Sequence, residues 1–202
     1  TFSCILKACS RTRCIDIGKQ IHYEIVDRGF FENNIMLGIA LVDMYANCGF
    51  LEKAQSVQVE LPFQTVASWN ALIEGYAQRE QFDEAMNCFE EMQRAGFCPN
   101  DATFISVLKA CGNRRAFEKG KQIHSELLER GFFEKNIMVG TALVDMYAKC
   151  GILGKAREVF NELPVQDIVS WNALIGGYAH HEQGYDALNC FVKMQRQGFY
   201  PN

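Results

Sequence analysis

The stretch SWNALI at residues 68–73 decides the fold, because it returns unchanged at 170–175, 102 residues further along the chain. When residues 1–100 are aligned with 103–202, 61 of the 100 pairs are identical and no gap is needed. Such self-similarity at a fixed offset is the signature of a repeat array rather than of a duplicated enzyme domain. The sequence therefore predicts repeated structural units.

Each block of 102 residues divides further into three helical hairpins. In residues 66–100, apolar side chains at positions 69, 72, 73 and 76 have the i, i+3, i+4, i+7 spacing of one helix face. A second helical pattern follows, and Gly96 and Pro99 end it. The same plan recurs twice more, so the units are 35, 36 and 31 residues long and sum to 102.

The hairpins predict how the whole chain folds. Alternating strand patterns are absent, and one hairpin alone cannot bury its apolar stripe. We therefore expect an all-α fold, an alpha-alpha superhelix (solenoid) of about six helix–turn–helix repeats, of either hand, with the first helices lining a groove. The chain is expected to form one array, with units at 1–34, 35–65, 66–100, 101–136, 137–167 and 168–202.

Composition narrows the classes of function. The chain is 49% hydrophobic and 22% charged with a net charge of −4, which is typical of a soluble protein and argues against strong nonspecific binding of polyanions. The nine cysteines form no C-x-x-C pair. They are interpreted as reduced thiols that serve as small apolar residues, with a metal site or a disulfide as the alternatives. No cofactor or metal is expected.

The unequal unit lengths and the local strings resemble the P, L and S motifs of plant-type pentatricopeptide repeat proteins, the PLS subfamily. VASWNALIEGYAQ at 66–78 looks like a P motif, TFISVLKAC at 103–111 like an L motif, and TALVDMYAKCG at 141–151 like an S motif. Tetratricopeptide units are similar but keep a fixed length of about 34 residues and a Leu-Gly pair, where this chain has Leu72-Ile73. The order is L (truncated), S, P, L, S, P, and we expect a fragment of a longer array.

The resemblance implies a function. Members of the family bind single-stranded RNA, with one base read per repeat by two or three side chains. Proteins with this alternation usually guide cytidine-to-uridine editing in mitochondria or chloroplasts, and a separate zinc deaminase domain performs the chemistry. That domain needs a C-x-x-C motif beside its H-x-E to hold the zinc, and no C-x-x-C occurs in this sequence. The chain is therefore expected to be no enzyme but a monomer that binds single-stranded RNA, with other editing-complex proteins as further partners.

In the family, the fifth and last residues of each motif read the base, and the second residue contacts its face. The resemblance assigns base reading to Asn70 with Asn100, Thr141 with Asp167, Asn172 with Asn202, and Ser3 with Asn34, and base sandwiching to Ala67, Met138 and Val169. The Asn pairs resemble pyrimidine readers, Thr with Asp a guanine reader, and Ser with Asn an adenine reader. Units 35–65 and 101–136 have Ile39 with Thr65 and Ile105 with Asn136, and an isoleucine cannot bond to a base edge. The implied target is 5′-A-N-Y-N-G-Y-3′, with the A read weakly.

Several of these residues also have simpler interpretations. Asn70 and Asn172 fit the first turn of any helix. Trp69 and Trp171 could stack on bases, but their place on the apolar face favours core packing.

Other positions point to structure rather than to a ligand. His22 and His124 have no second ligand at metal spacing, which favours packing or solvent exposure. Gly18 and Gly120 predict a close approach of helices, and Gln58, which replaces Phe160, predicts a weak spot in the core. The alternative function is a protein-interaction scaffold of the tetratricopeptide kind.

Overall fold

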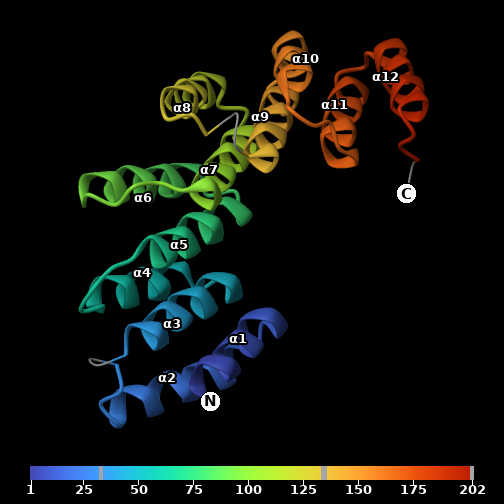
Figure 1. Ribbon diagram of the computed structural model, residues 1–202. Coiled ribbons are helices and arrows are strands. Elements are labelled where there is room, and N and C mark those ends of the chain that lie inside the picture. Colours follow the sequence, from blue (N-terminus) through green and yellow to red (C-terminus); the bar gives the residue numbers. More distant parts are fainter. Residues whose placement is uncertain (32–33, 133–135, 201–202) are drawn as a thin grey trace. The chain divides into compact units, whose positions relative to one another are not determined.

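The secondary structure of the described chain is entirely helical (Figure 1). The computed structural model describes residues 1–31, 34–132 and 136–200, and twelve helices lie within these ranges. They are α1 (Phe2–Thr12), α2 (Ile15–Asp27), α3 (Ile35–Cys48), α4 (Leu51–Glu60), α5 (Val66–Gln78), α6 (Phe82–Arg94), α7 (Asp101–Arg114), α8 (Phe117–Glu129), α9 (Ile137–Lys149), α10 (Leu153–Glu162), α11 (Ile168–His180) and α12 (Gly184–Arg196).

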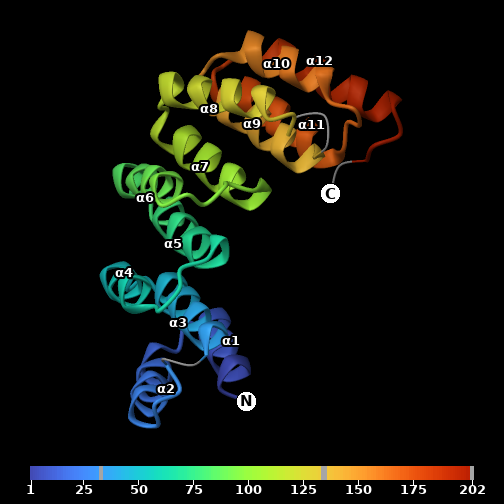
Figure 2. The same ribbon diagram turned by 60° about the vertical axis from the view of Figure 1, so that its left-hand side comes forward.

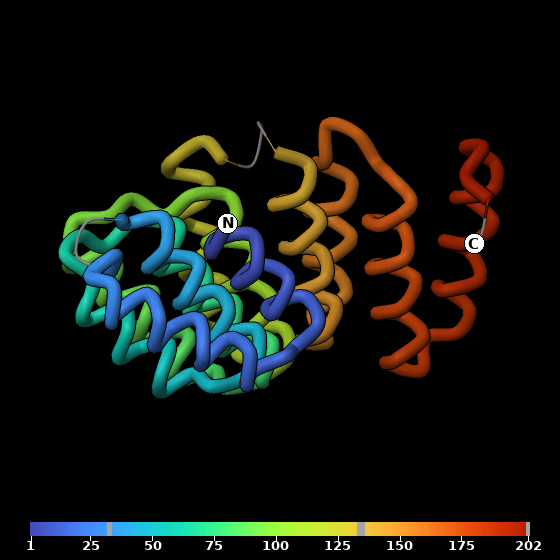
Figure 3. Tube along the Cα trace, turned by 90° about the horizontal axis from the view of Figure 1, so that it is seen from below, coloured from blue at the N-terminus to red at the C-terminus, as the bar shows by residue number. Residues whose placement is uncertain are grey.

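The helices group into two larger compact parts, Thr1–Val107 and Leu108–Asn202, whose boundary falls within α7. In the N-terminal part α3 packs between α1 and α5, so the first helices of successive hairpins lie side by side (Figures 1 and 2). In the C-terminal part α9 packs on α11 in the same way. Second helices pack along their own first helices in the α3–α4, α5–α6, α9–α10 and α11–α12 hairpins, and the last of these can be followed at the red end of the tube (Figure 3).

Each hairpin turn is closed by a left-handed residue just after the first helix. In the 31-residue units this residue is glycine, Gly49 with φ 87° and Gly151 with φ 80°. In the longer units it is a charged residue, such as Arg13 with φ 56° or Glu80 with φ 59°. The next backbone N–H then donates back into the last turn, as from Phe50 to the carbonyl of Tyr45 at 2.9 Å. This satisfies a carbonyl that the helix end would otherwise leave unpaired.

The glycines of the GKQIH strings allow a close contact between helices, as the sequence predicts. A Cβ at Gly18 would lie 2.5 Å from Sδ of Met44, and a Cβ at Gly120 would lie 2.5 Å from Sδ of Met146. Real Cβ atoms do not approach other atoms so closely, so a larger residue at Gly18 or Gly120 would force the facing methionine side chain to move. The helix interior accepts the cost of glycine, about 1 kcal/mol, to gain this packing.

The two tryptophans belong to the core, as the apolar spacing predicts. Trp69 is 6% exposed and Trp171 is 3% exposed. Trp171 contacts Phe160 edge to face, with ring centroids 4.5 Å apart. Gln58, which takes the place of Phe160 in the first block, is 1% exposed, and neither of its amide atoms has a hydrogen-bond partner. The predicted weak spot is therefore a buried amide without a partner, which is costly.

The buried histidines each bond to a tyrosine of the neighbouring hairpin. Nδ1 of His22 lies 2.9 Å from the hydroxyl of Tyr45, and Nδ1 of His124 lies 2.8 Å from that of Tyr147. Both histidines are over 90% buried, at 9% and 7% exposure. Burial lowers the pKa of both rings below the ordinary value of 6.5, and a nearby lysine lowers it further. Structural packing is thus the role of these rings.

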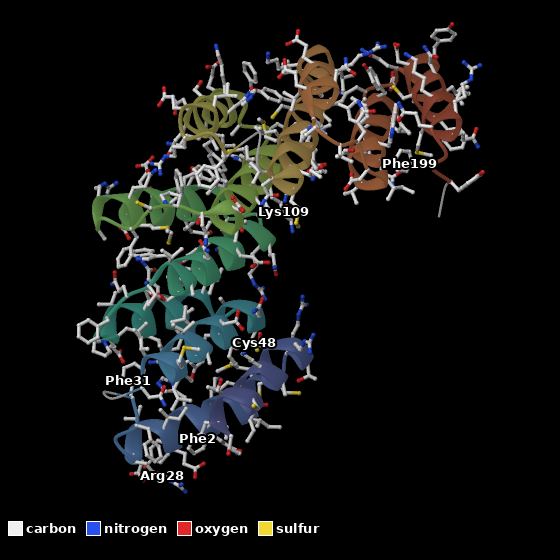
Figure 4. All side chains as sticks on the ribbon, viewed as in Figure 1. Phe2, Arg28, Phe31, Cys48, Lys109 and Phe199 are labelled. Atoms are coloured by element: carbon white, nitrogen blue, oxygen red, sulfur yellow. The ribbon has the colours of Figure 1, made fainter. Side chains whose placement is uncertain are left out.

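Aromatic contacts also join α1 to the end of α2. The rings of Phe2 and Phe30 have centroids 6.1 Å apart, and the guanidinium carbon of Arg28 lies 5.9 Å from the Phe2 ring centroid (Figure 4). Cysteines fill other gaps in the core, because Cys9, Cys88, Cys111 and Cys190 are buried. Burial raises the pKa of Cys88 and Cys111 to about 12, so these thiols stay protonated and unreactive.

Candidate nucleic-acid interface

Within the described ranges, the residues expected to read bases lie near the starts of the odd-numbered helices or just before them. In the five units whose last residue the structure describes, that residue is also the side chain that caps the following helix. The side-chain oxygen of Asn34 accepts from the N–H of Leu37, that of Thr65 from Ser68, that of Asn100 from Thr103, that of Asn136 from Met138, and that of Asp167 from Ser170. Capping leaves these side chains with a fixed orientation, which the sequence patterns did not reveal.

In residues 66–100 the expected pair of readers meets directly. Nδ2 of Asn70 donates to Oδ1 of Asn100 at 3.0 Å. Asn100 is exposed and Asn70 is half-buried, so both amides lie near the surface. Ala67, the residue expected to contact the base face, is exposed one turn before Asn70. The three side chains therefore form a small polar and apolar site at the start of α5.

In residues 137–167 the two expected readers have different surroundings. Thr141 is 8% exposed, and its Oγ1 is buried without a hydrogen-bond partner. Asp167 is half-buried and accepts from the backbone N–H of Ser170 at 2.8 Å. Met138, the expected base-face residue, is 67% exposed. The Thr141 hydroxyl is therefore a buried donor and acceptor without a partner, while the Met138 side chain is open to solvent.

The remaining expected readers are described only in part. Ser3 is half-buried and Asn34 is exposed. Asn172 is exposed, and Val169 beside it is 58% exposed. Asn202, the expected partner of Asn172, lies outside the described residues.

The two positions expected to be unreadable are apolar side chains at the surface boundary. Ile39 and Ile105 are both half-buried. They occupy the fifth place of their units, where Asn70 and Thr141 carry polar groups. Their side chains offer shape but no hydrogen bond to a base edge.

Sequence reasoning missed one member of this site, Thr103. Its hydroxyl donates to Oδ1 of Asn70 at 2.6 Å, and it belongs to the next unit, 33 residues away. The string NDAT at 100–103 carries a signal for it, since a capping residue followed three places later by a hydroxyl also occurs in TVAS at 65–68 and DIVS at 167–170.

The part of the chain that the structure describes also bears on two other kinds of site. Across 1–31, 34–132 and 136–200, no group of three or more His, Cys, Asp or Glu side chains could hold a metal ion. Over the same ranges, no helix is both long and apolar enough to cross a membrane.

Comparisons with known proteins agree with the geometry. A model described as the PPR repeat family matches residues 64–113 and 166–202, and one described as the PPR repeat matches 141–168. A pentatricopeptide repeat-containing protein of Arabidopsis thaliana is 41% identical over 198 residues, which cover 98% of this chain and 27% of the relative. A second from that plant, named as chloroplastic, is 38% identical over 100% of this chain and 38% of its own length.

A solved structure has the same fold. The pentatricopeptide repeat protein PPR10, in complex with an 18-nt psaJ RNA element, matches with a TM-score of 0.83 and 21% identity over 99% of this chain and 30% of that one. The fold is therefore the predicted all-α superhelix of helical hairpins. The chain belongs to the pentatricopeptide repeat family. It spans about a quarter to two fifths of its curated relatives, from 27% to 39% of their length.

Proposed function

We propose that this chain binds single-stranded RNA and reads one base with each helical repeat. The observation that carries the proposal is the direct contact between Asn70 and Asn100, the fifth and last residues of one unit. Family membership supports it, as does the RNA complex in which the similar PPR10 was solved. Single strands suit such a site because their base edges are exposed, whereas paired RNA hides them in a deep groove.

The chemistry at each unit follows from the side chains. Two short polar groups at the start of a helix can bond to one Watson–Crick edge, while Ala67, Met138 and Val169 supply apolar contact to the faces of bases. With units at 1–34, 35–65, 66–100, 101–136, 137–167 and 168–202, the proposed target is 5′-A-N-Y-N-G-Y-3′. Ile39 and Ile105 make the second and fourth bases unread.

The wider role is proposed from the relatives. The alternating unit lengths support membership of the PLS subfamily and a part in organellar RNA processing, as the recognition segment of a cytidine-to-uridine editing factor. Several relatives are named as chloroplastic, which favours the chloroplast over the mitochondrion. We propose that the chain binds as a monomer, that another domain performs any catalysis, and that further editing-complex proteins act with it.

A binding experiment tests the proposal. A pool of single-stranded RNAs randomised over six bases is incubated with the protein at low salt, and the bound fraction is separated by electrophoretic shift and sequenced. We expect enrichment of a pyrimidine at the third base and of guanine at the fifth. Binding is expected to weaken only modestly with salt, because a chain of net charge −4 neutralises few phosphates.

Matched variants make the test specific. Asn70→Ala is expected to abolish the preference at the third base alone, while Ile39→Val, which keeps an apolar fifth residue, leaves the selected sequences unchanged. A pool without preference for guanine at the fifth base would contradict the proposed order of reading. A complete lack of RNA binding would instead favour a protein-interaction scaffold, for which the exposed Tyr185 and Leu188 of α12 offer an apolar surface.

A further inference from the structure

Thr103 is tied to both readers of unit 66–100. It is fully buried at 0% exposure, and its hydroxyl lies 2.6 Å from Oδ1 of Asn70 and 3.0 Å from Oδ1 of Asn100. The same oxygen accepts from the backbone N–H of Asn100 at 3.0 Å. The backbone N–H of Thr103 donates to Oδ1 of Asn100 at 3.1 Å.

These bonds determine which way each amide faces. A backbone N–H can only donate, so Asn100 must present its oxygen to the N–H of Thr103. That oxygen can only accept, so Asn70 must present its NH₂ group to Asn100. The oxygen of Asn70 then faces the Thr103 hydroxyl and accepts a hydrogen bond from it. The chain of bonds allows neither amide to flip without losing a partner.

The other described junctions lack this connection. In α5 and α11 the equivalent residues are Ser68 and Ser170, and their hydroxyls donate to the backbone carbonyls of Thr65 and Asp167 at 3.0 and 2.8 Å. At the starts of α3 and α9 the equivalent residues are Leu37 and Val139, which have no hydroxyl. Among the junctions that the structure describes, only the hydroxyl of Thr103 reaches the fifth residue of the preceding unit.

We propose that Thr103 is a specificity-determining positioning residue, which fixes the Asn70 amide in one orientation and so makes unit 66–100 distinguish between the two pyrimidines. The inference rests on the proposed RNA binding. Cytosine presents a donor at N4 and an acceptor at N3, whereas uracil presents an acceptor at O4 and a donor at N3. A carboxamide fits one of these edges in one orientation and the other when it is flipped. A fixed amide therefore selects one pyrimidine, and a freed amide accepts both.

The test compares two substitutions at Thr103. Thr103→Val keeps the branched shape and removes the hydroxyl, while Thr103→Ser keeps the hydroxyl. Affinities are measured for RNAs that carry C or U at the third base and are otherwise identical. We expect the wild type and Thr103→Ser to discriminate between them by about fivefold, the worth of one hydrogen bond of about 1 kcal/mol. Thr103→Val leaves only the bond from Asn70 to Asn100 to orient the amide, and is expected to lower the ratio measurably below that of the wild type.

A control separates specificity from stability. Ser170→Ala also removes a hydroxyl that supports a helix cap, but one that does not reach the fifth residue of the preceding unit. We expect it to lower the melting temperature about as much as Thr103→Val while leaving the C-to-U ratio at the third base unchanged. Equal ratios in the wild type and Thr103→Val would overturn the inference, as would loss of discrimination in Thr103→Ser.

A measurement without RNA distinguishes failure of the inference from failure of the proposed function. Hydrogen exchange of the Asn70 side-chain amide, followed by NMR, is expected to be slow in the wild type and Thr103→Ser and faster in Thr103→Val, which holds the amide by one bond fewer. Unchanged exchange in Thr103→Val would refute the positioning role itself. Slow exchange in a protein that binds no RNA would instead overturn the proposed function and, with it, the reading role of Thr103.

Discussion

The units at residues 35–65 and 137–167 share most of their sequence yet differ in what they bury. In the second, Phe160 packs edge to face on Trp171 at 4.5 Å. In the first, the same place holds Gln58, whose amide is buried without a partner, while the indole Nε1 is buried without a partner in both Trp69 and Trp171. The comparison teaches that the hairpin plan tolerates a poor core residue, because backbone turns and neighbouring helices hold the unit together.

The two units also differ where a base would be read. The first has Ile39 and Thr65, and the second has Thr141 and Asp167. Both pairs occupy the same places, since Thr65 and Asp167 each cap the next helix through a serine N–H. The cap requires only an oxygen at the last residue, which leaves its exact chemistry free to vary with the base.

The largest change in stability is expected when Phe160 is replaced by glutamine, the residue that occupies the equivalent position 58. Phe160→Gln removes the ring that packs on Trp171 and buries an amide in its place. We expect the free energy of unfolding to fall by about 4 kcal/mol, measured by urea denaturation. A loss below about 1 kcal/mol would mean that the contact between the rings contributes little.

The reverse exchange is expected to repair the first unit. Gln58→Phe removes two buried polar atoms without partners and adds apolar contact with Trp69. We expect stability to rise by about 1–2 kcal/mol, with a higher melting temperature. Gln58→Leu serves as the control for lost polarity without a new ring, and a destabilised Gln58→Phe would show that the pocket in the first unit is too small.

Each block of 102 residues contains one buried histidine, His22 or His124, whose effect on stability can be tested by varying the pH. Burial lowers the pKa of His22 and His124, so the folded protein binds protons less readily than the unfolded chain. Their stability contribution is therefore present above the unfolded pKa of about 6.5 and is lost as the pH falls below it. We expect the melting temperature to decrease from pH 7 to pH 5, and His22→Gln and His124→Gln each to reduce that decrease. A decrease that neither variant reduces would point to other groups.

The smallest effect is expected on base preference, when the residue types of Thr141 and Asp167 are placed at positions 39 and 65. Ile39→Thr with Thr65→Asp gives the first unit the polar pair of the second. We expect a preference for guanine at the second base of about fivefold, from roughly 1 kcal/mol of new hydrogen bonding, measured by the affinities of four RNAs that differ at that base. A matched change of Thr65→Ser keeps the cap and is expected to create no preference.

Much of the fold follows from local patterns in the sequence. Helical spacing, turn glycines and the offset of 102 residues predict twelve helices in hairpins, and the buried tryptophans and close glycine contacts were predicted correctly. The site could be predicted only in part. The frame of the repeat points to Asn70 and Asn100, and the string NDAT indicates a bond between Asn100 and Thr103, but nothing in the sequence shows that Thr103 also bonds to Asn70, 33 residues away.

The sequence by itself determined the helices, the hairpins and the family, because helix spacing and turn chemistry act over a few residues and are repeated in each block. Only the tertiary structure decided which polar atoms meet. The orientation of the Asn70 amide, the lack of a partner for the Gln58 amide and the unpaired hydroxyl of Thr141 depend on how one hairpin packs on the next. Hydrogen bonds require distances near 3 Å and a defined direction, which a pattern of residue types does not specify.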